Sequence, residues 1–165
     1  MTEAADFVTF VADQGLYAIP VNRVQEILDL RPVAPLPGTP SHLLGVIDLR
    51  GANVPILDLR CILGRPSAKD TAQTRILIVW MGKSDHRLLV GLRSDSVIEV
   101  TQLDGGEIKP MDGAEMLHWH GKAVIGFGRR DGVVVSVLDL DNLFTAQAQA
   151  RPRSCDAWSR PPPRV

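Results

Sequence analysis

The amino-acid sequence predicts a mainly β domain made of two similar subdomains. Short apolar runs rich in branched residues alternate with closely spaced turn signals, a pattern typical of strands. Long helical patterns are few. One strand-turn-strand segment, residues 45–60, recurs near the end of the chain at residues 126–144. Because repetition of such a unit implies a repeated structure, we expect two related β subdomains.

The first copy of the repeat predicts a β-hairpin. Residues 51–53, Gly-Ala-Asn, carry the turn signal, since glycine and asparagine tolerate the positive φ that tight turns need. The runs on either side, 46–47 and 54–57, are too short for helices and are expected to be strands. Pro55 cannot donate a hydrogen bond within a sheet, so its strand is predicted to lie at an edge or to end there. Arg50 is thereby presented beside the turn.

The two copies agree at specific positions and in order. The aligned pairs are Gly45 with Gly126, Gly51 with Gly132, Leu57 with Leu138, Asp58 with Asp139 and Leu59 with Leu140. A fainter match precedes them, since residues 24–27 (Val-Gln-Glu-Ile) resemble residues 97–100 (Val-Ile-Glu-Val). Two matches in the same order support two similar subdomains more strongly than one short match would.

Each remaining element follows from its local pattern. Alternating or continuous short apolar runs predict strands, and Gly, Asp or Asn between two runs predicts a turn. Residues 21–28 combine helical spacing with β-branched residues, which predicts a helical turn running into a strand. In chain order we expect strands at 7–11, 16–19, 75–81 and 88–92, turns at 13–15, 82–85 and 104–106, and short helices at 41–44 and 141–150.

The domain organisation is expected to be simple. Residues 1–150 are predicted to form one domain, large enough for a real core. The segment 63–74 is the best internal boundary, which places subdomain one at about 7–66 and subdomain two at about 74–146. Residues 151–165 hold four prolines and four arginines with little to bury, and they are expected to be disordered.

Composition excludes several classes of protein. The net charge of −1 gives no bulk attraction to nucleic acid or to anionic lipid. No apolar run approaches the roughly 18 residues that a membrane span needs. The segment 1–6 has acids and no basic region, unlike a signal peptide. Cys61 and Cys155 are too few for a disulfide framework or a zinc site. We therefore expect a cytoplasmic protein.

The candidate chemical motifs favour structural roles. His118 and His120 would lie on one face of a strand, but zinc needs a third protein ligand, so we expect no metal and no cofactor. The sequence has no nucleophile and base in a recognisable pattern, so we expect no catalysis. Four acids recur at strand ends, where Asp ordinarily accepts backbone hydrogen bonds in turns. These acids are Asp48, Asp58, Asp139 and Asp141.

Arg50 is the candidate binding residue. At a hairpin end, an aliphatic stem can pack while the guanidinium stays exposed for carboxylate recognition. The alternative is that Arg50 is an ordinary solvated arginine on the surface, with no binding role. The apolar residues Val24, Leu77, Val97 and Val100 are expected either in the core or along an apolar groove where the subdomains meet.

Several motifs together carry a family resemblance. They are Tyr17-Ala18-Ile19, Val24-Gln25-Glu26-Ile27, Leu49-Arg50-Gly51, the run 55–60 and Leu138-Asp139-Leu140. In matched order from about 7 to 144, the chain resembles the CheW family, the coupling proteins of bacterial chemosensory arrays. The family fold is two five-stranded SH3-like β-barrels with a groove between them, which agrees with the internal repeat. The chain departs from the family in having Asp48 where Asn is usual, and Arg93-Ser94 where an apolar pair is usual.

The resemblance implies a non-catalytic adaptor. Such a protein bridges the cytoplasmic tip of a methyl-accepting chemoreceptor and the regulatory domain of a CheA-type histidine kinase, in receptor arrays at the inner membrane. The implied receptor surface includes Val24, Glu26, Leu77, Val97 and Val100, with Arg50 near the interfaces. Two alternatives stay open. One is a small-ligand-binding β-barrel, and the other is a coupling adaptor in a chemosensory pathway that does not control swimming.

Overall fold

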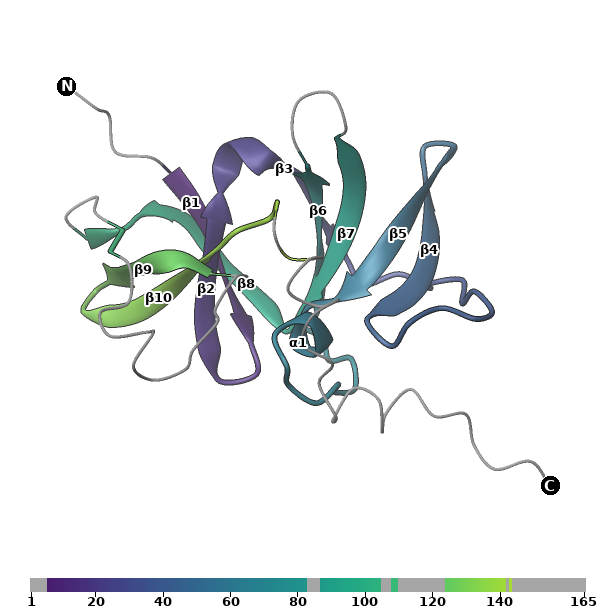
Figure 1. Cartoon of the computed structure of the whole chain (residues 1–165), viewed down its shortest axis with the longest axis horizontal. Helices are drawn as coiled ribbons and strands as arrows, with labels where there is room; N and C mark the ends of the chain where they lie inside the picture. The colour runs from purple at the N-terminus through teal and green to yellow at the C-terminus, as the bar shows by residue number, and fades with distance from the viewer. Residues whose placement is uncertain (1–5, 83–86, 105–107, 110–123, 142, 144–165) are drawn as a thin grey trace.

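The computed structural model describes residues 6–82, 87–104, 108–109, 124–141 and 143. They form two β lobes with a short helix at the base between them (Figure 1). The elements are β1 (Asp6–Ala12), β2 (Gly15–Pro20), the 3-10 helix η1 (Val21–Arg23), β3 (Val24–Asp29), β4 (Leu43–Leu49), β5 (Ala52–Asp58), α1 (Leu59–Ile62), β6 (Arg75–Met81), β7 (Leu88–Ser94), β8 (Ser96–Gln102), β9 (Val124–Arg130) and β10 (Val133–Leu138).

The strands form two five-stranded sheets. Sheet A has the order β8-β1-β2-β10-β9, and sheet B has the order β3-β6-β7-β5-β4. Each sheet contains one parallel pair, β2 with β10 in sheet A and β5 with β7 in sheet B. The mainly β fold with two sheets confirms the predicted fold class, and each sheet fits an SH3-like subdomain.

The two sheets repeat each other position by position. Strand β3 occupies the place in sheet B that β8 occupies in sheet A, and the hairpin β4–β5 corresponds to β9–β10. The two segments that match in the sequence therefore lie at equivalent places in the structure. The remaining equivalence is between the hairpins β6–β7 and β1–β2. The N-terminal hairpin β1–β2 therefore lies in the same sheet as the C-terminal strands β8, β9 and β10.

This arrangement differs from a division into consecutive halves at 7–66 and 74–146. Sheet B uses β3–β7 alone, whereas sheet A joins strands from both ends of the chain. The reason is pairing: β1 binds β8 along an antiparallel register from Asp6–Gln102 to Val11–Ser96, and β2 binds β10. These contacts give the N-terminal hairpin backbone partners on both sides.

Two glycines show why the repeat conserves its first position. A Cβ built on Gly45 would lie 2.1 Å from the Ala34 carbonyl oxygen, and one on Gly126 would lie 2.7 Å from the Lys109 carbonyl oxygen. In the first copy Ala34 exchanges two backbone hydrogen bonds with Val46, the residue after Gly45. In the second copy Lys109 does the same with Phe127, the residue after Gly126. The N···O distances are 2.7–2.9 Å. Only glycine leaves room for this close approach.

The hairpin turns also match between the copies. Arg50 and Gly51 have φ of 51° and 87°, and Asp131 and Gly132 have φ of 52° and 81°. Two successive residues with positive φ give the tight connection that suits the twist of antiparallel strands. The predicted hairpin is confirmed, but its turn lies at Arg50 and Gly51 instead of the predicted residues 51–53. Ala52 and Asn53 belong to β5, and Arg50 itself adopts a left-handed conformation.

The core has three parts. One cluster lies within sheet B and includes Ile47, Ile56 and Ile76. A second lies within sheet A and includes Phe7 and Val137. The largest lies between the sheets and takes side chains from both; its fully buried members include Phe10, Ile19, Leu57, Leu59, Leu77, Leu92, Leu138 and Leu143. The two lobes are therefore held together by a shared apolar core.

Strand β6 explains how one strand serves two of these clusters. Ile76 and Ile78 point into the sheet B cluster, while Leu77 and Val79 point into the cluster between the sheets. All four are 0% exposed. A strand buried on both faces has a continuous apolar sequence, as residues 76–81 do.

Two expectations about local structure need correction. Residues 41–44 do not form a helix: 41–42 make a turn, and Leu43 begins β4 opposite Leu57, because the backbone is used for sheet pairing. The short helix lies instead at α1, where Asp58 caps the backbone N–H of Arg60. Pro55 does not lie in an edge strand.

Pro55 is tolerated in the interior strand β5 for a simple reason. Strand β5 lies between β4 and β7, but its pairing with β7 begins only at Ile56, opposite Gly91. Pro55, which has no backbone N–H, therefore lies before the first residue that pairs with β7.

The predicted helical turn and strand over 21–28 are confirmed as η1 and β3. Most of the predicted helix at 141–150, and the tail at 151–165, lie outside the described residues.

Candidate functional site

The pair Glu26 and Arg50 joins the two end strands of sheet B. Arg50 Nη1 donates to Glu26 Oε2 at 2.6 Å, and Nη2 donates to Oε1 at 3.2 Å. Glu26 lies on β3, and Arg50 lies in the turn after β4. The Arg50 side chain is 71% exposed, so the guanidinium remains accessible to a partner while it holds Glu26.

The pair also sets the ionisation of its members. The hydrogen bond from Arg50 lowers the pKa of Glu26, and the same bond raises the pKa of Arg50. Both side chains are therefore charged near neutral pH. A surface with a fixed, oriented ion pair offers a partner a carboxylate and a guanidinium in defined positions.

Sheet A has a corresponding pair that the sequence analysis did not identify. Arg130 Nε donates to Glu99 Oε1 at 2.7 Å, and its Nη2 also contacts that oxygen. Glu99 is the repeat partner of Glu26, and Arg130 ends β9 just before the turn. Part of the signal was present, because residues 24–27 match residues 97–100. The two arginines are not at equivalent positions, since Arg50 is the first residue of its turn and Arg130 is the last residue of β9. Both pairs join the end strands of a sheet.

The predicted apolar site residues fall into different environments. Val24 and Val97 are half-buried and both pack on the cluster between the sheets. Val100 on β8 is 54% exposed. Leu77 is 0% exposed, because the face of β6 that carries it points into that cluster. The structure therefore places Leu77 in the core, and Val24, Glu26, Arg50, Val97 and Val100 where their side chains have exposed atoms.

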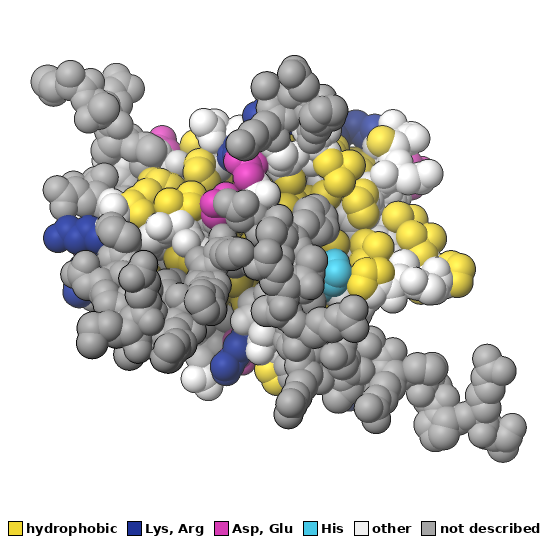
Figure 2. Space-filling view, in the orientation of Figure 1, with side chains coloured by type: hydrophobic (Ala, Val, Ile, Leu, Met, Phe, Trp, Pro, Cys, Tyr) yellow, Lys and Arg dark blue, Asp and Glu magenta, His cyan; other side chains and the backbone are white. Residues whose placement is uncertain are grey.

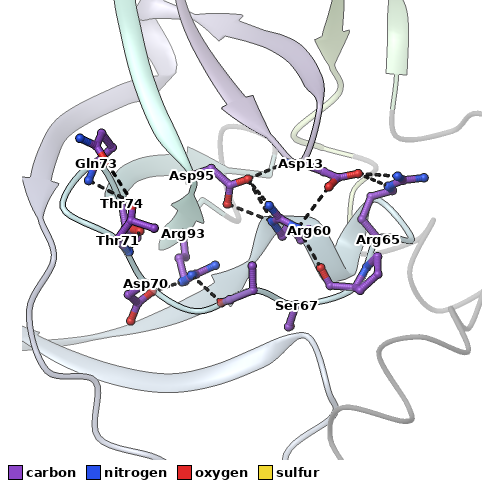
Figure 3. Close-up of polar contacts among 12 residues, drawn as sticks. Asp13, Arg60, Arg65, Ser67, Asp70, Thr71, Gln73, Thr74, Arg93 and Asp95 are labelled. Atoms are coloured by element: carbon purple, nitrogen blue, oxygen red, sulfur yellow. Dashed lines mark hydrogen bonds and ion pairs between the residues drawn. The ribbon is translucent and has the colours of Figure 1, made fainter.

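A second polar cluster lies where the lobes meet (Figure 3). Arg60 of α1 donates from Nη2 to Asp95 Oδ2 at 2.7 Å and from Nη1 to Asp13 Oδ1 at 3.2 Å. Arg65 donates from Nε to Asp13 Oδ2 at 2.6 Å. The Asp13 backbone N–H donates to Asp95 Oδ2 at 2.7 Å. This cluster joins the β1–β2 turn of sheet A to the helix that follows β5 of sheet B.

The same cluster fixes the charge of its central arginine. The hydrogen bond to Asp95 is the main cause that raises the pKa of Arg60, and Asp13 and Asp58 act in the same direction. The Arg60 and Asp95 side chains are 17% and 20% exposed. Partly buried, multiply bonded ion pairs of this kind fix geometry, so the cluster orients the two lobes.

Arg93 has a separate role on the inner face of sheet B. It is only 6% exposed and lies opposite Asp58 in the parallel pairing of β5 and β7. Its Nε donates to Asp70 Oδ1 at 2.5 Å, and its Nη2 donates to the Ala68 carbonyl oxygen at 2.8 Å. The charge of Arg93 is therefore compensated by the partly exposed Asp70, by the buried Asp58 carboxylate at 3.7 Å, and by a carbonyl of the α1–β6 connection.

The strand-end acids accept backbone hydrogen bonds, as predicted. Asp48 accepts from the Gly51 N–H at 2.9 Å, and Asp58 accepts from the Arg60 N–H at 3.2 Å. Asp139, the repeat partner of Asp58, accepts from the Asp141 N–H at 3.1 Å. Asp141 in turn accepts from Gly82 N–H at 3.1 Å and from Arg23 at 2.7 Å. The positions of Asp48, Asp58 and Asp139 follow from turn and cap geometry, whereas Asp141 binds groups that are distant in the sequence.

Other chemistry has little support in the part of the chain that the structure describes. Within it, no group of three or more His, Cys, Asp or Glu side chains is arranged to hold a metal ion. His118 and His120 lie outside the described residues. Among the helices of that same part, none is long and apolar enough to cross a membrane.

Comparison with known proteins gives a consistent family match. The model of the CheW-like domain matches residues 6–148. The chemotaxis protein CheW of Rhizobium meliloti is 30% identical over 139 residues, which cover 83% of this chain and 84% of that protein. Protein FrzA of Myxococcus xanthus is 29% identical over 105 residues, covering 64% of this chain and 63% of that protein.

A solved structure extends the match to three dimensions. The crystal structure of the scaffolding protein TtCheW from Thermoanaerobacter tengcongensis superposes with a TM-score of 0.75 at 26% sequence identity. The superposition covers 86% of this chain and 93% of that one. Both lobes are therefore present in the same arrangement in the two proteins.

Proposed function

This chain belongs to the family of CheW-like domains, and we propose that it is a non-catalytic adaptor coupling methyl-accepting chemoreceptors to a CheA-type histidine kinase. A scaffold role in chemotaxis is common to its family and to the matched scaffolding protein. In this proposal the protein works in the cytoplasm, within receptor arrays at the inner membrane. The observation that carries it is the match across residues 6–148, which includes both sheets.

The proposed receptor surface lies along the end strands β3 and β8. Val24 and Val97 offer half-buried apolar contacts beside the cluster between the sheets, and Val100 adds an exposed one. Glu26 and Arg50 add an oriented ion pair. Small apolar contacts rimmed by charged groups suit a specific, reversible interface. Leu77 supports this surface from the core instead of forming part of it.

Further apolar surface is available on the lobe of sheet B. Hydrophobic side chains gather on its visible face in Figure 2. The large hydrophobic residues of that lobe with more than a third of their surface exposed are Ile27, Leu30, Leu36 and Leu88. An adaptor that must bind two proteins at once needs separate surfaces of this kind. We assign the kinase to the ends of the lobes.

Affinity capture tests this proposal directly. The full-length protein, immobilised and exposed to lysate of its native host, is expected to retain a CheA-type kinase identified by mass spectrometry. The matched control is the Gly45→Ala protein, which we expect to be misfolded because of its backbone clash. Recovery of metabolic enzymes or small-molecule carriers, with no histidine kinase, would contradict an adaptor role.

A further inference from the structure

A cavity of about 690 Å³ opens at one end of sheet B. Its floor is the inner face of the sheet, where Ile56 and Ile76 are buried. Its walls come from the β3–β4 connection, β4 and the α1–β6 connection, and their apolar side chains include Leu30, Val33 and Leu44. The mouth of a β-barrel is a common place for a small-molecule site, and this volume is typical of one.

The internal repeat explains why sheet B is open at this end. Leu30 is the first residue after β3, and Leu103 holds the equivalent place after β8. Leu103 is 4% exposed and packs in the sheet A core against Gly128, where an added Cβ would lie 2.6 Å from Leu103 Cδ1. The residue of β4 at the place of Gly128 is Ile47, and its buried side chain occupies this room in sheet B. Leu30 is therefore 40% exposed and lies in the cavity wall instead of filling the barrel.

The charged side chains that line the cavity are three cations and two carboxylates. At the floor, Arg93 donates to Asp70 at 2.5 Å and faces Asp58 at 3.7 Å, so these groups compensate one another. Arg31 and Lys69 are exposed, and neither lies within 4 Å of a carboxylate oxygen in the part of the chain that the structure describes. The cavity therefore has an excess of one positive charge, and its uncompensated cations lie at the opening.

An amphiphile with one negative charge matches both parts of this cavity. The apolar walls suit a hydrocarbon chain, and the cations at the opening attract a negatively charged headgroup. Asp58 and Asp70 oppose a second negative charge in the same space. The headgroup remains in contact with solvent at the opening, so it needs no access to the buried guanidinium of Arg93.

We propose that this cavity binds a medium-chain fatty acid. Its hydrocarbon chain packs on Leu30, Val33 and Leu44, and its carboxylate lies beside Arg31 and Lys69. The site lies within one lobe, and the proposal does not rest on the adaptor function.

The test uses octanoate as the probe, 1,2-octanediol as its neutral counterpart and octylammonium as its cationic counterpart. Each is titrated into the full-length ¹⁵N-labelled protein while backbone resonances are followed by NMR. For a molecule of this size we expect saturable binding of octanoate with a Kd of about 1 mM, and resonances of Leu30, Val33, Leu44 and Ala68 should move. The diol and octylammonium should bind at least about fivefold more weakly, because they lack the negative charge. Butanoate should bind at least about tenfold more weakly, because its shorter chain buries less apolar surface.

A double substitution tests the contacts of the headgroup. Arg31→Gln together with Lys69→Gln removes both exposed cations and should weaken octanoate binding at least about fivefold, while the binding of 1,2-octanediol stays unchanged. The matched control is Arg129→Gln, which removes an exposed arginine from the other lobe and should leave both dissociation constants unchanged.

Large side chains locate the site. Val33→Trp fills the cavity from its wall and should abolish the response to octanoate. Leu36→Trp changes an exposed leucine of the same connection that does not line the cavity, and it should retain the response. If Val33→Trp does not fold, as judged from its NMR spectrum, Ala68→Trp fills the cavity from the α1–β6 connection and replaces it.

Three results would overturn the proposal. The first is the absence of a saturable response to octanoate, as expected if the cavity holds only water. The second is equal or tighter binding of the diol or of octylammonium, or unchanged octanoate binding in the double variant, which would reject the anionic headgroup. The third is an unchanged response in the cavity-filling variant, which would place octanoate elsewhere.

Discussion

Glu26 and Arg50 form a two-bond ion pair that connects β3 to the β4–β5 turn across the open side of sheet B. Arg50 therefore has two roles, and a single substitution of Arg50 would affect both at once. It fixes the neighbouring carboxylate, and in the proposed interface its accessible guanidinium also binds a partner. The first two predictions separate these roles.

Arg50→Glu is expected to weaken kinase or receptor binding by about tenfold or more, because it reverses a charge at the proposed interface. The thermal transition should stay nearly unchanged, since the side chain is mostly exposed. The double variant Glu26→Arg with Arg50→Glu restores the pair in reverse and should not restore binding. Arg129→Glu, an exposed arginine in the equivalent hairpin, is the matched control. Full binding by Arg50→Glu, or full rescue by the double variant, would assign Arg50 to folding alone.

The pKa of Glu26 should depend on Arg50. Removing the donor in Arg50→Ala is expected to raise this pKa toward the ordinary value of 4.5, as measured by NMR of the side-chain carboxyl carbon. The pair's contribution to stability is present above the unfolded-state pKa and is lost as pH falls through the lowered folded-state pKa. Arg31→Ala is the control, because Arg31 is the weakest of the contributors that lower this pKa. An equal effect of both variants would argue against the two-bond geometry.

Asp58 and Asp139 should both be structural. Replacing either with alanine is expected to lower the free energy of unfolding by roughly 1–3 kcal/mol, because a backbone N–H loses its acceptor. Asp58→Ala should be the more costly, since it also removes a carboxylate that faces buried Arg93. Urea denaturation measures the difference, with exposed Asp29→Ala as the control. Unchanged stability together with a lost activity would instead indicate a functional acid.

The repeated glycines give a test of the architecture. Gly45→Ala and Gly126→Ala each force a Cβ against a neighbouring carbonyl, so each should cost about 3 kcal/mol or more or prevent folding. Gly51→Ala meets open space and should cost only about 1–2 kcal/mol, through its positive φ. Denaturant unfolding of the three variants checks this order. Tolerance of alanine at Gly45 and Gly126 would contradict the close approach of the two chain segments.

The local parts of the fold were predictable because their signals are local. The turn at Gly51, the matching turn at Gly132 and the capping acids are set by residues within a few positions of each other. The place of the N-terminal hairpin was not predictable in this way. Its pairing with β8 and β10 depends on strands far apart in sequence, and no short motif specifies that register.

The candidate site shows the same limit. Arg50 stood out because a turn flanks it, but its bond to Glu26 joins strands that the sequence does not order. Leu77 could not be assigned to core or surface, because β6 is apolar on both faces and therefore lacks alternation. Arg93 looked like a departure from the family, and only the structure reveals the partners Asp58 and Asp70 that compensate it.

The most direct measurement of the adaptor function is co-sedimentation of three purified components. Membranes carrying a methyl-accepting receptor are mixed with a CheA-type kinase from the same host, with and without this protein. We predict that the kinase sediments with the membranes only when the protein is present, and that Arg50→Glu reduces the sedimented kinase while Arg129→Glu does not. Equal kinase in the pellet with and without the protein, across its full concentration range, would contradict the coupling role.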